Sequence, residues 1–187
     1  MKPIRSALAA AALAIAGTLA TSACTSLPDE VDRAEIDASS RAALNKLVRD
    51  NAAARAISQQ SRAVLVFPSI VKGGLGFGGA YGEGELIQNG RTLGYYNSFT
   101  GSWGLQAGAQ SYGYVVFLMN DEAVNYLDES DGWEIGVGPN VVLVNAGVAQ
   151  NLSTSTLKED AYAFIFDQKG LMAGVSIEGT KITKMDN

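Results

Sequence analysis

Glycine recurs at alternate positions in residues 73–85, which read GGLGFGGAYGEGE, and this spacing limits what the chain can form. One parity of the stretch is almost entirely glycine, at Gly74, Gly76, Gly78, Gly82 and Gly84. The other parity carries the bulky side chains Leu75, Phe77 and Tyr81, together with Gly79. Alternate residues of a strand share one face, and a glycine face permits tight bending or close approach of another element. We therefore predict a strongly curved strand with one glycine face.

Gly74, Gly76 and Gly79 also fit the spacing G-x-G-x-x-G, which is typical of dinucleotide-binding loops. That motif acts only where a strand ends and a helix begins. Here residues 68–72 separate the glycines from the nearest strand candidate, and the residues after Gly79 include two further glycines, which disfavour a helix. The context therefore contradicts a nucleotide site, and no cofactor is predicted. Close approach of this backbone to a ligand stays open as an alternative.

Two helices are expected before the glycine stretch, and one helix after it. Apolar residues at spacings of three and four predict a helix over Val31–Val48. Asn51 is positioned to cap a second helix, Ala52–Gln60, and Asn120 to cap a third that ends near Leu127.

Short runs of apolar residues between turn signals predict a series of strands. The candidates are Ala63–Phe67, Gly84–Ile87, Thr92–Tyr96, Ser102–Gln110, Tyr114–Met119, Trp133–Val137, Val141–Val148, Ala161–Phe166 and Leu171–Glu178. Asn89-Gly90 predicts a type I′ hairpin turn, Asp167–Gly170 a second turn, and Gln150–Lys158 a polar loop. The predicted fold class is α+β, with a glycine-rich, strongly curved antiparallel sheet or partial barrel. The N-terminal helices and one inserted helix pack against this sheet.

The N-terminus has the pattern of an export signal. Lys2 and Arg5 precede an apolar run over residues 7–20, which is too short to cross a bilayer, and small residues then lead to Cys24. The pattern resembles the lipobox of bacterial lipoproteins, except that Thr21 stands where Leu is usual. It predicts a signal peptide over residues 1–23, an acylated Cys24 with a tether over 24–30, and one domain over 31–187. Plain cleavage after Ala23, giving a periplasmic or secreted protein, is the alternative to a lipoprotein of the outer membrane.

Charge is distributed unevenly along the chain. The formal net charge of −5 argues against nucleic-acid binding. Between residues 41 and 72 only Asp50 opposes six cations, which are the candidate lipid-binding residues: Arg41, Lys46, Arg49, Arg55, Arg62 and Lys72. Acidic residues gather between Asp121 and Glu134. The two segments are either ordinary solvated faces, or a positive patch that faces anionic lipid with the acidic end turned away.

The chain lacks the usual catalytic groups. It has no histidine, its single cysteine is the acylation candidate, and zinc sites built from Cys and His are excluded by count. Glu83 and Glu85 share a strand face, so an acid/base pair or a hard-cation site is an alternative there, but a solvated face is the simpler interpretation. We predict neither an enzyme nor a metal site.

Aromatic residues cluster among the glycines, at Tyr81, Tyr95, Tyr96, Phe99, Trp103, Tyr112 and Tyr114. Such residues usually fill a core or cover gaps left by glycine. The alternative is that some of them line an apolar groove or lie at a membrane interface, where amphipathic rings are favoured.

Several blocks of sequence resemble the SYLF domain family. They are AVLVFPSIVKGGLGFGGAYGEG at 63–84, YNSFTG at 96–101, WGLQAGAQ at 103–110, VVFLMN at 115–120 and GLMAGVSIEG at 170–179. The resemblance implies lipid binding, with a preference for phosphoinositides in eukaryotic members, through an N-terminal amphipathic helix and basic residues. By position this points to the Arg41–Arg62 segment and to Lys72. Some eukaryotic members fused to Src-homology-3 domains bind actin, which an exported bacterial protein would not normally meet.

The sequence thus predicts a non-catalytic domain that binds anionic phospholipid and is anchored to the bacterial envelope through acyl chains. The alternative is a structural or protein-interaction lipoprotein of the envelope without a specific lipid ligand.

Overall fold

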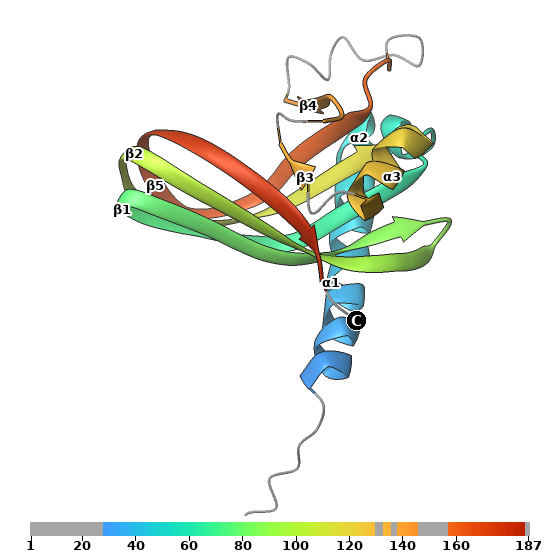
Figure 1. The fold of residues 1–187 in the computed structure, drawn as a ribbon, viewed down its shortest axis with the longest axis horizontal. Coiled ribbons are helices and arrows are strands. Elements are labelled where there is room, and N and C mark those ends of the chain that lie inside the picture. Colours follow the sequence, from blue (N-terminus) through green and yellow to red (C-terminus); the bar gives the residue numbers. More distant parts are fainter. Residues whose placement is uncertain (1–27, 130–132, 136–137, 146–156, 186–187) are drawn as a thin grey trace, which may run out of the picture.

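The computed structural model describes residues 28–129, 133–135, 138–145 and 157–185. The helices within them are α1 (Pro28–Asp50), α2 (Ala52–Ser58) and α3 (Asp121–Glu129), as labelled in Figure 1. The strands are β1 (Ala63–Gln88), β2 (Arg91–Leu118), β3 (Trp133–Glu134), β4 (Val141–Leu143) and β5 (Ala161–Lys184). The predicted signal segment, Cys24 and most of the predicted loop 150–158 lie outside the described residues.

Three very long strands form the sheet. β1, β2 and β5 have 26, 28 and 24 residues, several times the usual strand length. The sheet order is β1-β2-β5-β3 with antiparallel pairing, and β4 pairs with β5 in parallel. Asn89 and Gly90, with φ of 51° and 75°, close the hairpin between β1 and β2. This confirms the predicted type I′ geometry, which requires positive φ at both central residues.

The three long strands bend together, so each has an outgoing and a returning limb. β1 bends at Gly76, whose φ is 75°, and opposite this point β2 bulges between Trp103 and Ala107. Figure 1 shows the strands running together to one end of the molecule, away from the helices, and turning back there. We call this part the arm, and define it as residues 71–81, 99–111 and 169–181. The rest of the described structure is the body.

The glycine face of β1 lies between the two limbs. A Cβ on Gly82 would lie 2.7 Å from the carbonyl oxygen of Ser69 on the opposite limb, and a Cβ on Gly84 would overlap the carbonyl oxygen of Val66. Glycine therefore allows the backbone of β1 to fold against itself, which confirms the predicted structural role. No strand-to-helix junction follows these glycines, so a phosphate-binding loop is not formed there.

The body has a hydrophobic core on each face of the sheet. On the inner face of the fold, α3 packs with Ala123 and Leu127 against Leu65, Leu118 and Trp133. On the outer face, α1 and α2 pack against a second cluster, with Leu47, Ile57, Val66, Phe117 and Phe164 among its members. Neighbouring residues of one strand, such as Leu65 and Val66, thus enter different cores.

Side-chain caps position two of the helices. Asn51 accepts a hydrogen bond from the Ala54 amide at 3.0 Å and begins α2, and Asn120 accepts one from the Ala123 amide at 2.8 Å and begins α3. Both predicted caps are confirmed, because each satisfies an amide that has no partner inside its helix.

The curved α+β fold is confirmed, but three details differ from prediction. Gly84–Ile87, Ser102–Gln110 and the neighbouring short candidates are parts of unbroken strands, because the pairing of β1 with β2 continues through the glycines and is only shifted at irregularities such as the one at Gly76. Residues 167–170 bend β5 without reversing it, through positive φ at Asp167 and Gly170. Val141–Leu143 pairs in parallel, where an antiparallel strand was predicted.

Candidate functional site

The six cations predicted to bind lipid are spread over the body and the arm. Arg41 donates to the Gly90 carbonyl and to Thr92, and Lys46 pairs with Asp167. Arg49 pairs with Asp50, Arg55 donates to the Val48 carbonyl, and Arg62 makes a two-pronged contact with Asp121 at 2.8 and 2.9 Å. Each of these side chains therefore has a partner within the protein. Only Arg49 and Arg55, at the junction of α1 and α2, are brought together.

Lys72 is separated from the other five and lies inside the arm. It is 6% exposed and pairs with Glu178 on the returning limb of β5. The ion pair therefore links the two limbs, as a buried cation needs a partner to offset its lost hydration.

Two lysines that the sequence reasoning did not select are exposed at the base of the arm. Lys169 pairs in register with Ser111 and thus lies level with Val71, and Lys181 pairs with Phe99 and lies level with Tyr81. Among the described residues neither lysine has an ion-pair partner. The sequence offered one signal for them: they flank the glycine-rich segment 170–180, whose one charged residue is Glu178.

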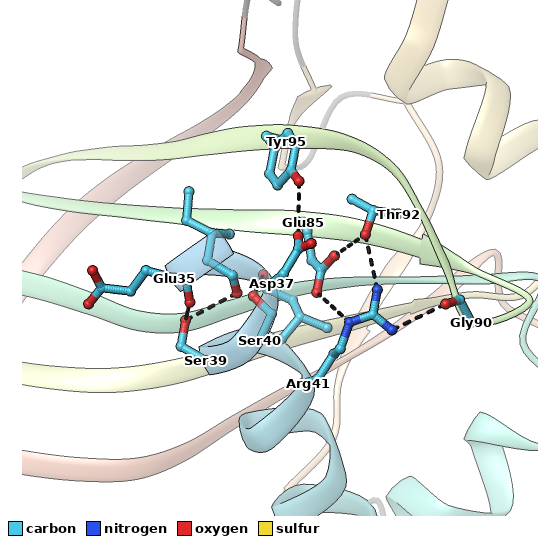
Figure 2. Close-up of polar contacts among 11 residues, drawn as sticks. Glu35, Asp37, Ser39, Ser40, Arg41, Glu85, Gly90, Thr92 and Tyr95 are labelled. Carbon is cyan, nitrogen blue, oxygen red and sulfur yellow. Dashed lines mark hydrogen bonds and ion pairs between the residues drawn. The ribbon is translucent and has the colours of Figure 1, made fainter. Parts of the chain in front are cut away.

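A buried carboxylate, Glu85, fastens α1 to the sheet. Figure 2 shows Asp37 and Arg41 of α1 facing Glu85 of β1, with Thr92 and Tyr95 of β2 beside them. Glu85 accepts a hydrogen bond from Thr92 at 2.6 Å, and its other oxygen lies 4.0 Å from Nε of Arg41 without a hydrogen bond. Tyr95 donates to Asp37 at 3.0 Å.

Burial raises the pKa of Glu85, and the Asp37 carboxylate raises it further, while the bond from Thr92 and the charge of Arg41 oppose the shift. Because Glu85 is inaccessible to solvent, it is unsuited to proton exchange with a substrate. Glu83 instead accepts a hydrogen bond from Tyr81 at 2.7 Å, next to the arm. The two carboxylates therefore do not open onto one common site, and the cluster is best explained as an anchor for α1.

The interior of the arm is polar where a soluble protein would be apolar. Ser102 and Gln106 hydrogen-bond to each other at 2.8 Å, and Thr100 bonds to Thr180 at 2.8 Å. Ser98, Thr100, Ser102 and Gln106 are all buried. With the Lys72–Glu178 pair and the glycine face of β1, these groups fill the space between the limbs.

The outer face of the arm is apolar and exposed. Leu105 and Leu171 are each 88% exposed, Leu75 is 82% exposed, and Phe77 and Trp103 stack with their ring centroids 5.9 Å apart. Val71, Tyr81 and Phe99 extend this surface towards the base. We call the eight residues together the apolar face. Of the seven aromatic residues singled out in the sequence, Tyr81, Phe99 and Trp103 are exposed on this face, whereas Tyr96 is buried. Whether the exposed rings lie at a membrane interface stays a prediction.

A cavity of about 220 Å³ lies where the arm joins the body. Its lining combines Ile70, Ile135 and Val141 with the phenols Tyr112 and Tyr114, and Glu178 lies at its polar side. Burial raises the pKa of both phenols, so they stay protonated donors at neutral pH. The lining suits a small amphipathic molecule, but it contains no nucleophile and base in contact.

The described residues lack two further kinds of site. They contain no group of three or more Cys, Asp or Glu side chains placed to bind a metal ion. Nor do they contain a helix with the length and apolar character needed to cross a bilayer.

Comparison with known proteins gives one family. Residues 99–187 match the family model described as "Ysc84: Las17-binding protein actin regulator". The match begins in the arm at Phe99 and covers most of β2, all of β3, β4 and β5, and α3. No curated protein matches the chain.

Proposed function

Because the chain belongs to the SYLF (Ysc84) family over residues 99–187, we propose that it is a non-catalytic domain that binds the surface of an anionic lipid membrane. The observation that carries this proposal is the apolar face of the arm. Phe77 pairs with Trp103 and Tyr81 with Phe99 in the sheet register, Leu75, Leu105 and Leu171 lie on the same three strands, and the described helices leave these side chains exposed. Large contiguous apolar surfaces of this kind mark interaction sites.

The energetic scale supports membrane binding. Removing one large apolar side chain from water contributes about 1.5–3 kcal/mol, so a few such residues give useful affinity before any electrostatic contribution. A free cation near an anionic surface adds about 1 kcal/mol. We propose the six predicted cations as contributors, but their internal partners compete with lipid, so each should contribute less than this.

Membrane attachment through Cys24 belongs to the same proposal. The acyl chains of a lipidated Cys24 would hold the domain at the membrane surface, and additional buried apolar residues strengthen such attachment. The apolar face supplies such residues in a chain tethered at Cys24. We propose an outer-membrane lipoprotein that faces the periplasm or the cell surface, with a periplasmic or secreted protein as the alternative.

The family description favours a second candidate, in which the apolar face binds a protein. The family is named for a Las17-binding actin regulator. Actin itself is an unsuitable partner for an exported bacterial chain. An envelope protein that covers the apolar face would account for the same exposed side chains.

Vesicle flotation tests the proposal. The full chain carrying Cys24→Ser, which cannot be acylated, should float with vesicles of equal parts phosphatidylglycerol and phosphatidylcholine. It should float less with pure phosphatidylcholine, and added salt should weaken the binding to the anionic vesicles. A chain that stays unbound with both vesicle types would contradict lipid binding and favour the protein partner.

A further inference from the structure

We propose that the arm is the part of the molecule that enters the membrane. Its apolar end would lie among the upper acyl chains of one leaflet, with Lys169 and Lys181 among the anionic headgroups. This inference rests on the proposed lipid binding and adds the surface, its orientation and its depth.

The arm places polar groups in its interior and apolar side chains on its exterior, the reverse of the body. Its four charged side chains divide into two pairs: buried Lys72 forms an ion pair with Glu178, which is 38% exposed, and Lys169 and Lys181 lie at the base. Apart from Glu178, which is paired with Lys72, the arm has no charged residue between its base and its bend. Hydroxyl and amide groups of Thr100, Ser102 and Gln106 turn inward and bond within the arm. Hydrocarbon requires polar groups to be hydrogen-bonded within the protein, and an apolar exterior over a hydrogen-bonded interior meets this requirement.

The length of the arm suits one leaflet. Five residues separate the bend at Gly76 from Val71 on one limb and from Tyr81 on the other, which gives about 16 Å of strand. Half of the hydrocarbon core of a bilayer is about 15 Å. Lys169 and Lys181 lie level with Val71 and Tyr81, so they reach the headgroup layer when the bend lies within the acyl region. Lysine and tyrosine are both favoured at that boundary.

Backbone hydrogen bonding sets the depth. Within the arm β2 pairs with β5 on one side and, except at the bulge over residues 104–106, with β1 on the other. β1 has one edge without a partner strand among the described elements, and β5 has one over residues 169–179, because β3 pairs with it only beyond that point. Hydrocarbon does not tolerate such open edges, because their amide and carbonyl groups lose water without gaining a partner. We therefore expect only the leucines and the Phe77–Trp103 stack near the bend to enter the acyl chains, while the edges farther back stay hydrated.

The distribution of charge favours lipid over a protein surface. Protein interfaces surround an apolar centre with a polar rim that supplies hydrogen bonds of both kinds. At the base of the apolar face Lys169 and Lys181 are exposed, and the exposed Glu134 of β3 lies opposite Lys181 in the register. Glu83 and Asp167 farther back are already bound by Tyr81 and Lys46. Unpartnered cations at the boundary of an uncharged surface are complementary to anionic headgroups.

Trp103 allows a direct test, since the chain has only two tryptophans and the other, Trp133, is buried in the body. In the full chain carrying Cys24→Ser and Trp133→Phe, fluorescence should shift to the blue on adding the anionic vesicles. Lipids brominated near the ester end of the chain should quench Trp103 more strongly than lipids brominated near the methyl end. Vesicle binding without a shift or quenching would overturn the arm proposal and leave lipid binding intact, whereas absence of binding would contradict both.

Matched leucine variants separate the arm from the body. Leu105→Ser should weaken vesicle binding by roughly tenfold to a hundredfold, the equivalent of one large apolar side chain. Leu93→Ser, at an exposed leucine near the hairpin at Gly90, should leave binding within about twofold. Equal losses in the two variants would overturn the proposal. A chain that forms dimers in size-exclusion chromatography without lipid, and monomers after Leu105→Ser, would assign the apolar face to a second copy instead.

The lysine pair is tested in the same assay. Lys169→Ser combined with Lys181→Ser should weaken binding to the anionic vesicles about thirtyfold and leave the quenching depth unchanged. Lys158→Ser, at a lysine outside the arm, is the control and should have little effect. Full retention of anionic binding in the double variant would overturn the assigned orientation.

Discussion

The arm and the body are made from the same three strands, yet they place their apolar residues on opposite sides. On β2, Phe117 is fully buried beneath the helices, while Phe99 is 60% exposed on the arm. In the body both faces of the sheet are covered, so nearly every strand residue from Val115 to Leu118 is apolar. In the arm the inner face carries glycine and small polar residues, and the outer face carries the large side chains.

This difference separates stability from function. The body supplies the burial that stabilises the fold, and the apolar residues of the arm contribute little to it, because they remain in water after folding. A chain that keeps such residues at the surface forgoes stability and solubility. We interpret this as the signature of a surface whose apolar residues are buried only when a membrane is bound.

The strongest test of the comparison is a pair of phenylalanine truncations on β2. Phe117→Ala should lower the free energy of unfolding by about 4 kcal/mol, since it leaves a cavity in the outer core. Phe99→Ala should change it by no more than about 0.5 kcal/mol. Urea unfolding of both variants measures the contrast.

If both truncations lowered the free energy of unfolding by a similar amount, the arm would be packed against other groups in solution. Its outer face would then be part of the stabilising core of a larger assembly, and the proposed membrane contact would have to be abandoned.

The next test concerns the fold-back that creates the arm. Gly84→Ala should cost about 3 kcal/mol, because the added methyl group would overlap the Val66 carbonyl oxygen on the opposite limb. Gly101→Ala provides the control, since a Cβ at Gly101 meets no atom within 4 Å. We expect a change of at most about 0.5 kcal/mol there, measured by the same unfolding assay. If Gly84→Ala left the free energy of unfolding unchanged, the two limbs would not be in contact in solution.

The alternation of glycine along β1 allowed one part of the fold to be predicted from the sequence. Gly74, Gly78, Gly82 and Gly84 share a parity, and a period of two places them on one face of a strand whatever the tertiary fold. The hairpin at Asn89-Gly90 and the caps at Asn51 and Asn120 were also readable, because each depends on residues within a few positions.

Long-range contacts were not readable in the same way. Whether Asp167–Gly170 reverses the chain or merely bends it depends on β2 lying beside β5 across that whole region, which no local pattern reveals. The six cations were selected by their density along the chain, but the partners that occupy them, such as Asp121 for Arg62, come from distant segments. Lys169 and Lys181 were missed for the same reason, since only the register places them level with Val71 and Tyr81.

Buried charge gives the smallest expected effect and the last contrast between the regions. In the arm, buried Lys72 faces an opposite charge, whereas in the body buried Glu85 shares its site with the like charge of Asp37. The pKa of Glu85 is therefore raised in the folded state above its ordinary value of 4.5. A carboxyl group with a raised pKa contributes most to stability when it is protonated, and that contribution is lost as the pH rises through the folded-state pKa.

Glu85→Gln should remove this loss, because the amide keeps an acceptor for Thr92 without a buried charge. We expect the variant to be more stable than the parent by about 1 kcal/mol at pH 8 and to approach it below pH 4.5, in urea titrations at several pH values. Glu83→Gln, two residues along the same strand and partly exposed, is the matched control. If the Glu85→Gln variant were less stable than the parent at pH 8, attraction between Glu85 and Arg41 would outweigh the cost of burying the carboxylate. Glu85 would then resemble the paired charges of the arm, and the two regions would treat buried charge in the same way.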